Sequence, residues 1–195
     1  MIRICVLGGI GSGKSFVAKL FSYPVFNADN EVNHIYKNDI NCYRKLRKKL
    51  PKYIKSFPVN KSYLIDAITA NRKNLKKISS IIHPIVRNRM KKFLKKKKKY
   101  KFIILDIPLL IENKLNKKDD VLIFVKSNKN KTLSRLKKRG NFNKKILKNL
   151  RESQSLLSKK KKLANYVLDN NFSINIMKKK IKLIKKKIIN ERSST

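Results

Sequence analysis

Residues 8–15 read GGIGSGKS, which matches the pattern G-x-x-x-x-G-K-[ST]. A β-branched, mostly apolar run of residues 2–7 precedes this stretch, and residues 14–21 carry apolar side chains at helical spacing. A glycine-rich loop of this pattern between a strand and a helix binds phosphate, because its successive backbone N–H groups converge at the positive end of the helix. Without the strand and the helix, the pattern would be only a glycine-rich turn. The sequence therefore predicts a buried parallel strand that ends in a phosphate-binding loop.

The residues of this loop have distinct expected roles toward ATP. The backbone N–H groups hold the phosphates, the Lys14 ammonium binds the β- and γ-phosphates, and the Ser15 hydroxyl binds Mg²⁺. ATP is therefore the expected co-substrate and Mg²⁺ the expected cofactor. The predicted ATP-binding residues of this stretch are Gly9, Ile10, Gly11, Ser12, Gly13, Lys14, Ser15 and Phe16.

Strands and helices alternate through much of the chain. Helices are predicted from Asn130 to Lys138 and from Ser173 to Ile189. Strands that alternate with helices predict an α/β fold, in which a parallel sheet is covered on both faces. The further predicted strands are residues 24–26, 102–105, 121–125 and 166–168, and the predicted apolar face of the terminal helix is Ile174, Met177, Ile181 and Ile184.

Residues 31–99 differ from the rest, because they show helical patterns without convincing strands. One helix is predicted to begin at His83 and Pro84, since proline is favourable at the first helical position. A helical segment inserted between the strands of a sheet is typical of a substrate-binding subdomain.

The chain of 195 residues carries a formal net charge of +41, which first suggests a polyanion binder. However, 42 lysines stand against 10 arginines, and arginine is the residue suited to bidentate contacts with phosphates and bases. Lysine, isoleucine and asparagine are all encoded by A- and T-rich codons, so a biased genome explains the charge. We expect no specific nucleic-acid partner, and we interpret the lysine runs as solvated helix faces.

Two cysteines, Cys5 and Cys42, provide neither a disulfide framework nor metal-ligand spacing, which favours a reducing compartment. The apolar run at residues 102–111 contains Asp106 and is shorter than the roughly 20 residues that span a bilayer. We therefore expect a soluble, cytoplasmic protein without a membrane partner. Cys5 is expected in the core of the first strand.

Two acids follow predicted strands, and each has two interpretations. Asp29 follows the second strand and is either a general base that accepts the proton of an attacking hydroxyl or the N-cap of a helix. Asp106 closes the apolar run FIILD and either holds Mg²⁺ through water or is a turn residue before Pro108. Local sequence does not decide between these alternatives.

Two arginines, Arg135 and Arg139, are four residues apart and therefore share one face of a helix. In a kinase, such a face closes over the triphosphate and neutralises the charge that develops during transfer. In a protein this basic, they could equally be two solvated charges. Both are predicted ATP-binding residues under the first interpretation.

In order along the chain, these stretches resemble the dephospho-coenzyme A kinase family. The loop GGIGSGKS, the segment NADNEV at 27–32 and the helix IIHPIVRNRM at 81–90 match family motifs. IPLLIEN, residues 107–113, is the most specific match, and LANYVLDNN at 163–171 follows Gln154 at the usual distance. The ordered matches cover nearly the whole chain.

The resemblance implies a three-layer P-loop kinase core (residues 1–30 and 100–195), a helical acceptor-binding subdomain (31–99) and a lid (139–154). It implies transfer of the γ-phosphoryl group of ATP to the 3′-hydroxyl of dephospho-coenzyme A. It also implies catalytic roles for Lys14, for Asp29 as general base and for Arg139 as the lid arginine. The acceptor-binding residues that it implies are His83, Pro108, Leu109, Leu110 and Glu112.

The chain departs from the family pattern at several positions. Asn27 replaces the first acid of the Asp-Ala-Asp segment, Phe16 stands where threonine often follows the loop, and Asn165 replaces an aspartate. Gly140 and Asn141 stand where an acid follows the lid arginine. Because the loop, Asp29 and PLLIEN remain, we predict an active enzyme, and the departures bear on its rate.

Two other functions share some of these features. Another P-loop nucleoside monophosphate kinase would share the loop and lid but would not require IPLLIEN. A basic nucleic-acid-binding NTPase would use the positive charge, and its ATPase activity would respond to RNA or DNA at physiological salt. A monomer is favoured for the oligomeric state.

Overall fold

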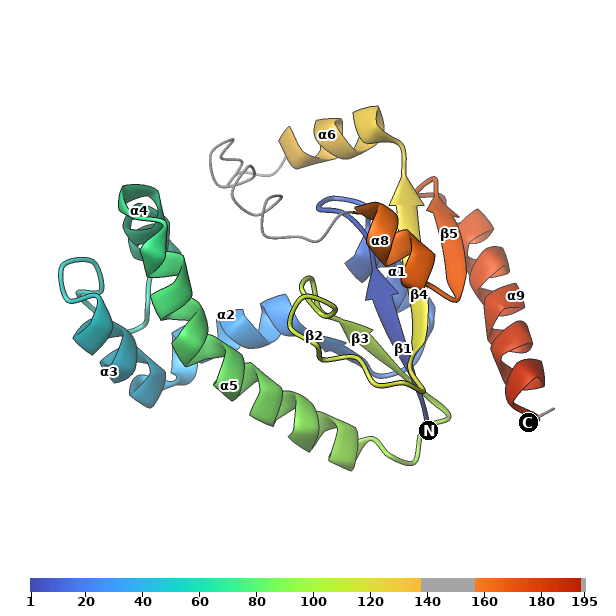
Figure 1. The fold of residues 1–195 in the computed structure, drawn as a ribbon, viewed down its shortest axis with the longest axis horizontal. Helices are drawn as coiled ribbons and strands as arrows, with labels where there is room; N and C mark the ends of the chain where they lie inside the picture. The colour runs from blue at the N-terminus through green and yellow to red at the C-terminus, as the bar shows by residue number, and fades with distance from the viewer. Residues whose placement is uncertain (138–156, 194–195) are drawn as a thin grey trace. The chain divides into compact units, whose positions relative to one another are not determined.

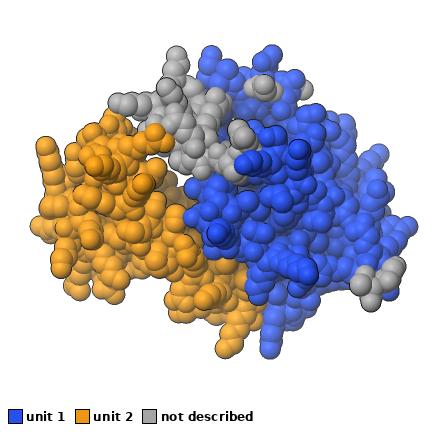
Figure 2. Space-filling view, in the orientation of Figure 1, with its two compact units in different colours: residues 1–27, 97–195 blue, residues 28–96 orange. Residues whose placement is uncertain are grey.

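The computed structural model describes residues 1–137 and 157–193, and Figure 1 shows the order of its elements. Figure 2 shows the two compact units of the chain, unit 1 (residues 1–27 and 97–195) and unit 2 (residues 28–96). The boundaries predicted from the sequence lie three residues later, after residues 30 and 99. The predicted lid lies outside the described residues, and so do Arg139, Gly140, Asn141 and Gln154.

Unit 1 is built on a five-stranded parallel sheet with the strand order β2-β3-β1-β4-β5. In the central strand, Ile4 is in register with Ile104 on one side and with Val121 on the other. The chain runs first to one edge of the sheet and then to the other, so the loop after β1 lies at the topological switch point. The strands are β1 (Ile2–Leu7), β2 (Val25–Asn27), β3 (Phe102–Asp106), β4 (Val121–Ser127) and β5 (Tyr166–Asn170). The predicted α/β fold is confirmed.

Helices cover both faces of this sheet. α1 (Lys14–Leu20) and α9 (Ile174–Ser193) pack together on one face, and α8 (Leu157–Leu163) packs against β4 on the other (Figure 1). α6 (Lys129–Lys137) follows β4. The core beneath α1 and α9 is apolar, as expected for parallel strands buried on both faces. Its largest contributors are Ile4, Val6, Val17, Phe21, Phe102, Ile104, Ile123, Leu168, Met177 and Ile181.

Two features of the C-terminal part differ from the sequence-based expectation. Ile174, which we predicted on the apolar face of the terminal helix, is 53% exposed, because it is the first residue of α9 and the buried face begins at Met177. α8 was not predicted, since the segment LSKKKKL has no apolar periodicity. Within it, Lys160 is buried rather than solvated, which contradicts our interpretation of that lysine run.

Unit 2 is helical, as the sequence predicts. Its elements are α2 (Ala28–Asn38), α3 (Ile40–Lys49), α4 (Lys61–Ala70) and α5 (Lys73–Lys96), and α5 packs against the other three. Side chains cap two of these helices: Asp39 accepts a 2.9 Å hydrogen bond from the Cys42 backbone N–H, and Asn60 accepts one of 3.0 Å from Ser62. The core of unit 2 includes Ile35, Tyr36, Leu46, Ile54, Leu64, Ala67, Ile78 and Ile82.

The prediction that a helix begins at His83 and Pro84 is wrong. α5 begins at Lys73, and Pro84 lies inside it. An interior proline removes a helical hydrogen bond and costs about 3 kcal/mol. Burial of Ile78 and Ile82 before the proline and of Met90 after it offsets this cost, because buried side chains hold the helix on both sides of Pro84.

Both cysteines are buried, Cys5 in β1 and Cys42 in α3, which confirms the expected core position of Cys5. Burial raises the pKa of Cys42 to about 11, so this thiol stays protonated at neutral pH. None of the helices in the described ranges has the length and hydropathy needed to cross a membrane.

Candidate active site

The carboxyl edge of the sheet in unit 1 gathers most of the candidate residues. Because the strands are parallel, they all end at this edge: β1 leads into the phosphate-binding loop and β4 leads into α6. β2 ends at Asn27, β3 at Asp106 and β5 at Asn170.

The phosphate-binding loop depends on glycine at two positions with left-handed backbone angles. Gly11 and Gly13 have φ values of 78° and 89°. A Cβ atom on Gly11 would lie 2.8 Å from Thr132 Cγ2 of α6, and one on Gly13 would lie 2.8 Å from Phe172 Cε1 and closer still to Asn170. The loop is therefore pressed between α6 and the end of β5, and any side chain at these positions would displace it.

Lys14 folds back over this loop. Its ammonium group donates hydrogen bonds to the carbonyl oxygens of Gly8, at 3.2 Å, and Gly9, at 2.9 Å. The charge is therefore held beside the backbone N–H groups that bind phosphates in such loops. Ser15 is exposed in the first turn of α1, so its hydroxyl is accessible to a metal ion, while Ile10 is half-buried at the turn of the loop.

Asn170 ties the loop to the last strand of the sheet. This side chain is 4% exposed, and its amide donates a 2.9 Å hydrogen bond to the Ser12 carbonyl oxygen. Its Oδ1 accepts a 2.9 Å hydrogen bond from the backbone N–H of Phe172. One buried amide thus connects the phosphate-binding loop with the segment that follows β5. Our sequence analysis included Asn170 in the motif LANYVLDNN but gave it no role.

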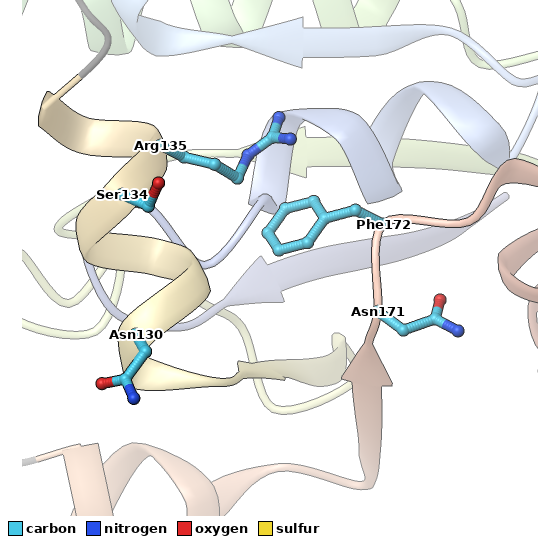
Figure 3. Close-up of a pocket in the computed structure, with 5 residues that line it drawn as sticks. All are labelled: Asn130, Ser134, Arg135, Asn171 and Phe172. Carbon is cyan, nitrogen blue, oxygen red and sulfur yellow. The ribbon is translucent and has the colours of Figure 1, made fainter.

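A hollow of about 470 Å³ opens between α6 and the segment after β5 (Figure 3). Arg135 extends from α6 over the ring of Phe172, with 4.2 Å between the guanidinium carbon and the ring centroid. Phe16 of α1 also packs against Phe172, with 6.2 Å between ring centroids. The residues that line the hollow are Asn130, Ser134, Arg135, Asn171 and Phe172.

This hollow combines features that suit a purine base: an aromatic ring, a planar guanidinium group and amide side chains. Arg135 was a predicted ATP-binding residue, but the sequence did not indicate Phe172 as its partner. The contact between Phe16 and Phe172 also accounts for one departure from the family pattern, since the two rings pack together.

Asp106 and Asn27 form a pair at the ends of adjacent strands. They are in register in β3 and β2, and the Asn27 amide donates a 2.5 Å hydrogen bond to Asp106 Oδ2. Asp106 is 2% exposed, so an acid at position 27 would set two carboxylates against each other in a buried place. The amide that replaces the family's acid therefore supplies a donor that holds the Asp106 carboxylate in position.

The residues present fit an Mg²⁺ ion that binds together with ATP. Among the residues that the structure describes, no group of three or more His, Cys, Asp and Glu side chains could form a metal cage. Mg²⁺ in ATP-dependent enzymes does not need such a cage, because it keeps several waters and binds one or two protein oxygens plus phosphates. The Ser15 hydroxyl and the Asp106 carboxylate are oxygen ligands of this kind.

The segment IPLLIEN forms consecutive turns directly after β3. Leu110 is 1% exposed and belongs to the core, whereas Pro108 and Leu109 are half-buried. The Asn113 side-chain and backbone N–H groups both donate to the Leu109 carbonyl oxygen, at 2.9 and 3.0 Å. Glu112 is held by the buried Lys160, with 2.7 Å between Oε1 and Nζ.

Asp29 and His83 belong to unit 2. Asp29 is exposed in the first turn of α2, where a carboxylate also interacts favourably with the helix dipole, but it is inside the helix and is not its N-cap. His83 is half-buried in α5, and burial together with the nearby Arg87 lowers its pKa below the ordinary value of 6.5. At neutral pH, His83 is therefore an uncharged imidazole.

Asn165 is another departure from the family pattern, and its side chain accepts a hydrogen bond that an aspartate in its place would also accept. Its Oδ1 accepts a 2.8 Å hydrogen bond from the backbone N–H of Leu122, where β4 begins beside β5. A carboxylate oxygen would accept the same bond. The replacement of acid by amide is therefore structurally conservative at this position.

Comparison with known proteins gives consistent matches over most of the chain. The family model described as dephospho-CoA kinase matches residues 2–175. The dephospho-CoA kinase of Wolbachia pipientis wMel is 31% identical over 175 residues, which cover 87% of this chain and 89% of the relative. The dephospho-CoA kinase of Oceanobacillus iheyensis is 32% identical over 181 residues, with 88% and 89% covered.

Solved structures show the same fold. TT1252 from Thermus thermophilus superposes with a TM-score of 0.78 at 24% identity, covering 95% of this chain and 97% of the other. The dephospho-CoA kinase from Campylobacter jejuni has a TM-score of 0.65 at 19% identity, with 97% and 98% covered. Shikimate kinase from Acinetobacter baumannii has a TM-score of 0.57 at 12% identity, with 98% and 94% covered.

Proposed function

This chain belongs to the dephospho-CoA kinase family, and from that premise we propose how its own residues perform the reaction. The enzyme transfers the γ-phosphoryl group of ATP to the 3′-hydroxyl of dephospho-CoA, which gives coenzyme A and ADP. The observation that carries this function is the phosphate-binding loop at the switch point of a parallel sheet, in a chain that matches the family over residues 2–175.

The donor site lies in unit 1. The backbone of Gly9, Gly11 and Gly13 binds the phosphates of ATP, and Lys14 turns from its carbonyl partners to the β- and γ-phosphates. The purine base occupies the hollow that the Arg135–Phe172 pair lines on one side, and it packs against the outside of that pair. Ser15 and Asp106 would hold Mg²⁺, the Asp106 carboxylate through water. When bound, Mg²⁺ neutralises charge on the phosphates of ATP.

Asp29 is the proposed general base. It follows Asn27, at the carboxyl end of β2, by two residues, and its exposed carboxylate is accessible to an acceptor. The 3′-hydroxyl oxygen forms a bond to the γ-phosphorus while its proton passes to Asp29. The bond between the γ-phosphorus and the oxygen bridging to the β-phosphate breaks, and ADP leaves with that electron pair. Arg139 neutralises the charge that develops on the transferred group.

The proposed acceptor-binding residues are those of IPLLIEN in unit 1 and, separately, His83 in unit 2. The turns of IPLLIEN bind dephospho-CoA through Pro108, Leu109, Leu110 and Glu112. Leu110 does so through its backbone, because its side chain is buried. His83, as a neutral imidazole, can donate or accept a hydrogen bond without adding charge. We further propose a monomeric, cytoplasmic enzyme without a specific nucleic-acid or membrane partner.

The direct experiment supplies purified protein with MgATP and dephospho-CoA and follows coenzyme A by chromatography. We expect coenzyme A and ADP in equal amounts. A parallel set of nucleoside monophosphates and shikimate should remain unphosphorylated. A folded preparation that binds ATP but forms no coenzyme A would contradict the proposed function. Stimulation of its ATPase activity by RNA at physiological salt would instead favour a nucleic-acid-dependent NTPase.

A further inference from the structure

Lys160 differs in its surroundings from the lysines beside it. It is the second of four consecutive lysines at positions 159–162, and it is 1% exposed, whereas Lys159, Lys161 and Lys162 are exposed. A general excess of lysine explains solvated side chains but not a buried ammonium group, because burial of an unpaired charge is strongly unfavourable. We therefore expect the Lys160 ammonium group to be paired with a particular acidic or polar group.

That partner is Glu112, in the turns that follow β3. The distance from Lys160 Nζ to Glu112 Oε1 is 2.7 Å, and the two side chains are 1% and 15% exposed. A charge-assisted hydrogen bond of this length restricts the rotamer of the glutamate. The orientation of Glu112 is thus determined by a helix that lies far from it in the sequence.

The same helix also lies against the phosphate-binding loop. A methyl group built on Gly9 would be 3.3 Å from Leu157 Cδ1, and Leu157 begins α8 one turn before Lys160. All three contacting segments belong to unit 1. α8 is therefore a common support for the loop that binds the donor and for the glutamate of IPLLIEN.

We propose that Lys160 is a positioning residue for the acceptor, which holds the Glu112 carboxylate in the orientation that accepts a hydrogen bond from dephospho-CoA. This inference rests on the proposed function, which assigns IPLLIEN to the acceptor. Lys160 is too deeply buried to touch substrate and acts through Glu112. Its loss should therefore weaken binding of dephospho-CoA and leave binding of ATP nearly unchanged.

The test compares Lys160→Met with the neighbouring Lys161→Met, which removes the same charge from an exposed position of the same helix. Steady-state kinetics with each substrate varied in turn give separate KM values. We expect KM for dephospho-CoA to rise about 10-fold or more in Lys160→Met, the usual effect of losing a hydrogen bond between charged groups. KM for ATP should stay within about twofold of wild type, and Lys160→Arg should recover part of the loss.

Other results would overturn the proposal. Equal KM values for dephospho-CoA in Lys160→Met and Lys161→Met would remove any role of Lys160 in acceptor binding. Parallel increases in both KM values would indicate general damage to the fold. If circular dichroism shows that Lys160→Met does not fold, Lys160→Gln, which keeps a donor for Glu112, replaces it in the test. If neither variant folds, Lys160 has a purely structural role and the proposal is overturned. A wild-type protein inactive on dephospho-CoA would contradict the proposed function itself.

Discussion

The side-chain amide of Asn170 donates a 2.9 Å hydrogen bond to the backbone carbonyl of Ser12, so the end of the last strand holds the phosphate-binding loop in place. The same side chain orients Phe172 through the backbone N–H of that residue. The site for the phosphates and the hollow proposed for the base therefore share one buried amide. This arrangement links the conformation of the loop to that of the hollow.

Replacing Asn170 by aspartate should weaken ATP binding. The variant keeps the shape of the side chain but turns a carboxylate oxygen toward the Ser12 carbonyl and brings negative charge near the phosphates. We expect KM for ATP to rise about 10-fold or more, the equivalent of about 1.4 kcal/mol. Asn116→Asp, which makes the same charge change at an exposed position, is the control. An ATP KM equal to that of the control would show that the hydrogen bond is dispensable.

Replacing Asp29 by asparagine should slow turnover without loss of ATP binding. If Asp29 accepts the proton of the 3′-hydroxyl, kcat should fall about 100-fold or more. ATP binding measured by calorimetry should remain at the wild-type level. Asp66→Asn, at an exposed position of α4, controls for the loss of one negative charge in unit 2. An unchanged kcat would show that Asp29 is not the general base and that it acts only through its interaction with the dipole of α2.

Replacing Asn165 by aspartate should be nearly neutral, whereas leucine should destabilise the protein. Aspartate keeps an acceptor for the Leu122 N–H, and leucine removes it. We expect the free energy of unfolding in urea to change by less than about 0.5 kcal/mol in Asn165→Asp and to fall by about 1 kcal/mol in Asn165→Leu. Equal losses in both variants would mean that the amide N–H₂ group, and not its oxygen, matters at this position.

Replacing Asp120 by alanine should destabilise unit 1 strongly. Asp120 pairs with Arg3 through two contacts of 2.9 Å, and both residues are buried. Alanine would leave the Arg3 guanidinium buried without its counterion, which typically costs about 3–5 kcal/mol. Urea unfolding measures the loss, and Asp119→Ala, an exposed neighbour, is the control. A variant as stable as this control would mean that Arg3 finds another partner.

His83 should make the stability of the protein depend on pH on the acidic side of neutrality. The pKa of His83 in the folded chain is below 6.5, so the unfolded chain takes up a proton first as pH falls. The stabilisation from the neutral imidazole is complete above pH 6.5 and is lost as pH falls toward the pKa of the folded state. The free energy of unfolding can be measured at pH 7.5 and 5.5, on either side of about 6.5. The difference between the two values should be smaller in His83→Gln than in the wild-type protein. If the free energy of unfolding depends on pH in the same way in both proteins, the titration of His83 does not contribute to stability.

Much of the fold was predictable because its signals are local. A buried parallel strand reads as a short apolar run, and a glycine loop between strand and helix has few other uses, so β1, α1 and the α/β class followed from composition and spacing. The start of α5 was not predictable in this way. Local preference favours a helix that begins at Pro84, and only burial of Ile78 and Ile82 carries the helix through the proline.

The sequence by itself determined the phosphate-binding loop, the succession of the five strands and the family motifs, since each depends on residues adjacent in the chain. Only the tertiary structure decided which side chains meet across the fold. It brought Asn170 to Ser12, Asn27 to Asp106, Arg135 to Phe172 and Lys160 to Glu112. The physical reason is that burial and pairing of a charge or an amide depend on segments far apart in the sequence. A run of four lysines therefore does not reveal which one of them is buried.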